Sequence, residues 1–103
     1  MNPNSSLQVY QIVEGHSYSI EEVAACTGIP RATIALYCRE EFIQALGDPS
    51  SEGWRFDASA IRRLRQIHHL RNLYDLNLSA LRLILDMHTH IEELRAQLRF
   101  LHR

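Results

Sequence analysis

Residues 18 to 37 carry the signals of two short helices joined by a tight turn. Ser19 and Glu22 have the spacing of a capping box, in which each side chain accepts a hydrogen bond from the other residue's backbone N–H. Gly28 can take the left-handed conformation that ends this helix, and Pro30 suits the first turn of the next one. The pattern predicts a helix-turn-helix, a motif that places its second helix in the major groove of DNA.

A hairpin is predicted after the second helix, which we expect to extend to about Glu41. The inward-facing residues of that helix are predicted to be Ile34, Tyr37 and Cys38. Between residues 42 and 57, the turn-forming run Gly-Asp-Pro-Ser-Ser-Glu-Gly precedes Trp54 and Phe56, which alternate as strand residues do. This hairpin is a wing, and a short strand over residues 7–13 is expected to pair with it in a small antiparallel sheet.

Two further helices complete the predicted fold. Asp57 caps the third helix, which is expected to reach about Tyr74, and Ser79 caps the fourth. Along the fourth helix, apolar side chains recur at alternating spacings of three and four residues, which is a heptad seam: Ile84, Met87, Ile91, Leu94, Leu98 and Leu101. The sequence therefore predicts a mostly α protein, with a winged helix-turn-helix domain over residues 1–78 and a C-terminal coiled-coil helix over residues 79–103.

The heptad seam has two interpretations. The helix either folds back on its own domain or pairs with a helix of another chain. An isolated helix of this length is marginal in water, and no later element covers the segment after Met87, so we favour a partner and expect a homodimer. His88, Arg95 and His102 flank one side of the seam, and His90 and Gln97 flank the other. They offer no pairs of opposite charge, and an antiparallel dimer or a contact with a different protein is equally compatible.

The charge of the chain conflicts with its DNA-binding pattern. Residues 1–57 contain three arginines and eight acidic residues, a net charge of −5, whereas residues 58–103 contain eight arginines and four acidic residues, a net charge of +4. Because DNA affinity comes mainly from neutralising phosphates, the acidic half would be repelled by a duplex. Ala32, Ala35 and Leu36 also offer no hydrogen bonds to base edges. We therefore expect no specific binding of nucleic acid.

An alternative interpretation keeps DNA as the ligand. Arg62, Arg63 and Arg65 form a basic cluster early in the third helix, a region that approaches phosphates in winged helix-turn-helix proteins. In this alternative the DNA-binding residues are Arg31, Arg55, Arg62 and Arg63. The other explanation is a solvated helix face, which we favour because three arginines opposite an acidic half of the chain would give only weak, non-specific binding.

Other kinds of site have little support in the sequence. His88 and His90 diverge around a helix and His68 and His69 are adjacent, so neither pair converges on a metal ion. Cys26 and Cys38 match neither a zinc spacing nor a redox motif. We found no phosphate-binding loop, nucleophile elbow, signal peptide or membrane-spanning run. The expectation is a cytoplasmic, non-enzymatic protein without metal or cofactor.

The chain resembles MerR-type winged-helix regulators over residues 18 to about 87. The resemblance rests on Tyr18-Ser-Ile-Glu-Glu-Val-Ala, Thr27-Gly-Ile-Pro, Thr33-Ile-Ala-Leu-Tyr and the wing end Gly53-Trp-Arg-Phe, followed by residues 63–79. It departs where DNA-binding members place arginines on either side of the Thr-Ile pair and a basic wing. This chain has Ala32 and Ala35 beside that pair and an acidic run, Asp48-Pro-Ser-Ser-Glu52, in the wing.

With its short length, acidic first half and helical tail, the chain is similar to the CbpM family of chaperone modulators. The resemblance implies a protein that binds and inhibits the J-domain of a DnaJ-like co-chaperone, CbpA, by covering its basic helix. The resemblance to MerR-type regulators implies pairing through the C-terminal helix. We expect the partner-binding residues to be Arg39, Glu40, Glu41, Asp48, Glu52 and Trp54. The alternative is a MerR-type DNA-binding transcription regulator.

Overall fold

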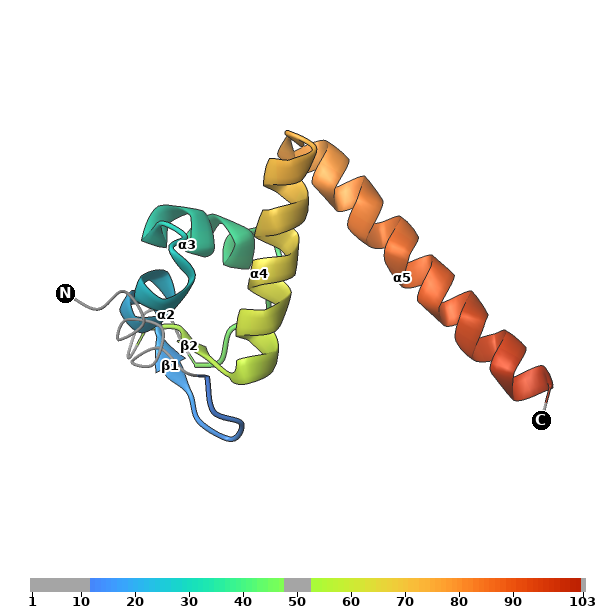
Figure 1. Ribbon diagram of the computed structural model, residues 1–103, viewed down its shortest axis with the longest axis horizontal. Helices are drawn as coiled ribbons and strands as arrows, with labels where there is room; N and C mark the ends of the chain where they lie inside the picture. Colours follow the sequence, from blue (N-terminus) through green and yellow to red (C-terminus); the bar gives the residue numbers. More distant parts are fainter. Residues whose placement is uncertain (1–11, 48–52, 103) are drawn as a thin grey trace, which may run out of the picture. The chain divides into compact units, whose positions relative to one another are not determined.

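The structure, a computed structural model, describes residues 12–47 and 53–102. Its elements are β1 (Tyr18–Ser19), α2 (Ile20–Thr27), α3 (Arg31–Arg39), β2 (Arg55–Phe56), α4 (Ala58–Leu73) and α5 (Leu78–Leu101) (Figure 1). The described residues fall into two compact units, divided between His69 and Leu70. The prediction of a mostly α, winged helix-turn-helix protein with a small β wing is confirmed.

Helix α2 begins and ends where the local sequence signals predict, and α3 begins directly after Pro30. At the start of α2, the Ser19 Oγ accepts from the Glu22 N–H at 3.1 Å, and the Ser19 N–H donates to the Glu22 Oε1 at 2.9 Å. Gly28 ends α2 with a φ of 75°, and its N–H donates to the Ala24 carbonyl. Pro30 directly precedes α3 and accepts the first helical hydrogen bond through its carbonyl oxygen. The two predicted caps of α2 are therefore confirmed.

The wing strand β2 pairs with the segment that leads directly into α2. β2 runs antiparallel to β1, with Tyr18 opposite Phe56 and Ser19 opposite Arg55. The predicted strand over residues 7–13 lies almost wholly outside the described residues, and its described end is not in a strand. The expected pairing therefore stays a prediction, and within the described residues the segment that leads directly into α2 lies alongside β2. The Arg55 guanidinium strengthens this arrangement by donating to the Ser17 carbonyl oxygen at 2.9 Å.

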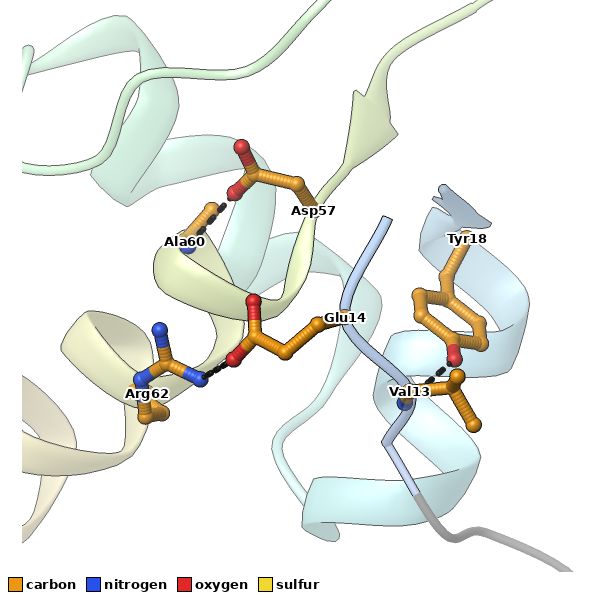
Figure 2. Close-up of polar contacts among 6 residues, drawn as sticks. All are labelled: Val13, Glu14, Tyr18, Asp57, Ala60 and Arg62. Carbon is orange, nitrogen blue, oxygen red and sulfur yellow. Dashed lines mark hydrogen bonds and ion pairs between the residues drawn. The ribbon is translucent and has the colours of Figure 1, made fainter. Parts of the chain in front are cut away.

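The core of the first unit is formed by apolar side chains from α2, α3, the wing and α4. Tyr37 and Phe56 are its largest fully buried side chains, and the others include Val23, Ile34, Ile61, Leu64 and Ile67. Cys38, which we predicted to face inward, is only partly buried. It follows Tyr37 by about 100° around the helix and therefore lies at the edge of the buried face. α4 begins at the predicted cap, where the Asp57 Oδ1 accepts from the Ala60 N–H at 2.8 Å (Figure 2).

The second unit contains the long helix α5, and its cap differs from the prediction. Asn77 is the N-cap, and its side chain accepts from the Ala80 N–H at 2.8 Å. Ser79 lies inside the first turn, so its prediction as the cap was wrong. Asparagine and serine cap helices almost equally well, and the extended backbone of Asn77 decides between them.

The heptad seam of α5 is largely exposed on the single chain. Ile84 is partly buried, whereas Met87, Ile91, Leu94, Leu98 and Leu101 are between 45% and 74% exposed. A continuous apolar stripe of this kind is available to a partner helix. None of the described helices has the length and apolar character needed to cross a membrane.

Candidate partner-binding surface

Helix α3 ends in a tight turn that reverses the chain. The Phe42 N–H donates to the Tyr37 carbonyl at 2.9 Å, and the Glu41 N–H donates to the Cys38 carbonyl at 3.1 Å. This is the Schellman pattern, which requires a left-handed residue at its centre. That residue is Glu41, with a φ of 63°, where glycine is usual. We expected α3 to extend to about Glu41, but the helix ends at Arg39 because Glu41 leaves the helical conformation.

The turn after α3 is fastened to α4 by two hydrogen bonds and is stabilised by one ring contact of its own. The Tyr37 hydroxyl and the His68 Nδ1 lie 2.9 Å apart, and the Tyr37 side chain is fully buried. The Tyr37 and Phe42 rings lie with their centroids 6.2 Å apart. The Arg63 Nε donates to the Phe42 carbonyl oxygen at 2.8 Å. These contacts hold the exposed Glu41 on a rigid scaffold.

Trp54 lies beside two hollows in the surface of the first unit. One, of about 420 Å³, is lined by Cys38, Glu41, Ile43, Gln44, Ala45 and Trp54, and we call it the Glu41–Trp54 hollow. The other, of about 510 Å³, is lined by Ser19, Ile20, Glu21, Arg31, Ala32, Ala35, Gly53 and Trp54. In the second hollow, the small side chains of Ala32 and Ala35 leave open space on either side of the Thr33–Ile34 pair.

The four arginines of the DNA-binding alternative all contact groups of their own chain. Arg31 forms an ion pair with Glu21 at 2.9 Å, and Arg62 forms one with Glu14 (Figure 2). Arg55 donates to Ser17, as described for the wing. Arg63 donates to the carbonyl oxygen of Phe42. The ion-paired arginines offer less net positive charge to a phosphate than the sequence count implies.

The predicted partner-binding residues occupy different positions in this surface. Glu41 and Trp54 come together in one hollow, which Arg39 and Glu40 do not line. Arg39 is exposed and Glu40 is partly buried. Asp48 and Glu52 lie outside the described residues. Glu21 and Gln44 also line the two hollows and were not predicted as site residues. Gln44 stands among the apolar residues Ile43, Ala45 and Leu46, and nothing in that pattern singles it out.

The two cysteine thiols are poorly suited to nucleophilic or ligand chemistry. Burial raises the pKa of the Cys38 thiol to about 11. Burial also raises the pKa of Cys26, although the Arg65 guanidinium, 3.9 Å from its sulfur, opposes this shift. Both groups are therefore protonated near neutral pH. In the part of the chain that the structure describes, no three His, Cys, Asp or Glu side chains are grouped as metal ligands.

The fold and surface define a helix-turn-helix protein with a wing and a long C-terminal helix. The sequence profile described as MerR HTH family regulatory protein matches residues 18–103. The chain therefore belongs to the MerR helix-turn-helix family of regulatory proteins. A search of curated proteins gives no match to the chain.

Proposed function

We propose that this MerR-family protein is a non-enzymatic modulator that binds and inhibits the J-domain of a CbpA/DnaJ-like co-chaperone. In this proposal the surface that relatives use for DNA has become a protein-binding surface. The basic helix of the J-domain docks there and is no longer available to its DnaK-type chaperone. We place the activity in the cytoplasm, where the thiols of Cys26 and Cys38 would stay reduced.

The main support for the proposal is that two candidate DNA-binding arginines are ion-paired within the chain, whereas the carboxylate of Glu41 is exposed. Arg31 and Arg62 are neutralised by acidic residues of the same chain, whereas Glu41 is exposed beside Trp54. A protein-binding surface commonly combines an aromatic anchor with a charged rim. Opposite charges would also steer a basic helix toward this surface. The same arrangement has little unpaired positive charge to bind the phosphates of DNA.

We further propose that two copies pair through the seam on α5. The exposed apolar side chains from Met87 to Leu101 support this assembly. A homodimer would present two partner-binding surfaces and bind two J-domains.

Binding and inhibition can be tested together with purified components. The J-domain of the co-chaperone from the same genome is immobilised for surface plasmon resonance, and a DnaK-type ATPase stimulated by that J-domain is assayed alongside. We expect saturable binding and a dose-dependent loss of the stimulated ATPase. Absence of both effects would refute the proposal.

A gel-shift titration with the DNA upstream of the gene tests the alternative function. We expect no discrete complex at submicromolar protein and physiological salt, because Ala32 and Ala35 cannot read base edges. A discrete complex that resists nonspecific competitor DNA would establish a transcription regulator instead.

A further inference from the structure

We propose that the Glu41–Trp54 hollow receives one arginine side chain from the basic helix of the partner. The identity of the partner rests on the proposed function, but the recognition chemistry rests on the hollow itself. Glu41, Trp54 and Gln44, which carry a carboxylate, an indole ring and a carboxamide, line the same space of about 420 Å³. These three groups together suit a guanidinium ion.

The carboxylate of Glu41 is available for an intermolecular ion pair. Glu14 and Glu21 are each paired with an arginine of the chain, and Glu22 accepts a hydrogen bond within its capping box. Glu41 forms no ion pair with any residue in the described ranges 12–47 and 53–102. It is exposed, so a partner can bind it without breaking an ion pair within the described part of the chain.

The backbone of Glu41 gives an independent indication of a functional role. Its φ of 63° lies in the left-handed region, which is sterically unfavourable for a residue other than glycine. Glycine would fill this place in the turn without that cost. A charged side chain in a strained backbone position beside a hollow supports a role in binding.

Arginine fits the lining better than lysine. A planar guanidinium stacks on an indole ring and forms two parallel hydrogen bonds with a carboxylate, whereas an ammonium group acts as a point charge. The side-chain carbonyl of Gln44 can accept a further N–H from the guanidinium. The net charge of the hollow is negative because Glu41 is its one charged lining residue among those that the structure describes.

The fluorescence of Trp54 provides a direct test, since the chain contains one tryptophan. The full-length protein is titrated with N-acetyl-arginine amide, and with the lysine and citrulline analogues in parallel. We expect a saturable change with the arginine compound in the millimolar range, a weaker one with lysine and none with uncharged citrulline. Equal responses to all three compounds, or no saturable response to arginine, would overturn the proposal.

The variant Glu41→Gln separates the role of the charge from that of the backbone. Glutamine suffers the same strain as glutamate at a positive φ, so the turn is unchanged while the carboxylate is lost. Glu93→Gln, on the exposed surface of α5, removes the same charge far along the chain as a matched control. The fluorescence response to arginine should disappear in Glu41→Gln and persist in Glu93→Gln. A response that survives in Glu41→Gln refutes the site.

The same two variants connect the site with the partner. If the chain binds the J-domain, Glu41→Gln should weaken the affinity about tenfold, mainly through faster dissociation, and Glu93→Gln should leave it unchanged. J-domain binding that Glu41→Gln leaves intact contradicts the site but not the proposed function. Conversely, an arginine response without J-domain binding contradicts the proposed function but not the site.

Discussion

The backbone N–H of Phe42 donates to the carbonyl oxygen of Tyr37, and the rings of the same two residues lie with their centroids 6.2 Å apart. The same two residues thus stabilise the end of α3 through a backbone hydrogen bond and through a contact between their rings. Because Tyr37 also contacts His68 on α4, the turn is anchored in the core. Glu41, at the centre of the turn, has little freedom to relax its backbone.

Replacing Glu41 with glycine should stabilise the protein. Glycine adopts a positive φ without steric cost, so the free energy of unfolding should rise by roughly 0.5–1 kcal/mol despite the greater flexibility of the unfolded chain. Urea denaturation measures this change. Glu40→Gly is the control, since Glu40 has a φ of −84° and glycine there should destabilise. A less stable Glu41→Gly protein would contradict our account of the turn.

The start of α5 can be tested by comparing two alanine substitutions. Asn77→Ala removes the side chain that accepts from the Ala80 N–H and should cost about 1 kcal/mol of stability. Ser79→Ala should have almost no effect, because Ser79 lies inside the helix. Thermal unfolding followed by circular dichroism compares the two variants. A larger effect at Ser79 would restore the cap that we first predicted.

The capping box of α2 makes a pH-dependent contribution to stability. Hydrogen bonds from the backbone N–H and then from the side chain of Ser19 hold the pKa of Glu22 below its usual value of 4.5. The folded state therefore favours the carboxylate, and this contribution is complete above pH 4.5 and is lost as the pH falls through the lower folded-state pKa. Glu22→Gln keeps a capping side chain without the charge. Its stability deficit relative to the wild type should shrink in acid; a deficit that is constant with pH would contradict this.

The seam on α5 should control the oligomeric state. If two copies pair through it, the double variant Ile91→Asn and Leu94→Asn should sediment as a monomer while the fluorescence of Trp54 stays unchanged. Glu93→Asn, at a position outside the seam, should remain a dimer. A wild-type protein that sediments as a monomer at all concentrations would remove the homodimer from the proposal.

The sequence was sufficient to predict the structural features that depend on residues close together along the chain. Ser19 with Glu22, Gly28 and Asp57 act within one helical turn, and each was predicted in its observed role. Asn77 and Ser79 lie so close together that the sequence could not rank them as caps. The left-handed Glu41 was not predicted because residues of its type seldom take that conformation.

Features that join distant residues were beyond sequence reasoning. β1 was missed because Tyr18 pairs with Phe56 across the helix-turn-helix, and two-residue strands leave no periodic pattern. The charge count gave the sign of the net charge of each half of the chain. It did not predict the pairing of Arg62 with Glu14, which lie 48 residues apart. The hollows beside Trp54 arise from the same long-range packing.

Ser19 ends β1 and also caps α2, so one residue belongs to two cooperative elements. Separating the strands would displace the hydroxyl that accepts from the Glu22 N–H, and fraying of α2 would in turn release the edge of the wing. In hydrogen exchange, the amides of the wing and of the first turn of α2 should therefore open as a single unit. A ligand that orders the wing would slow exchange at the start of α2 as well, although it touches no atom there.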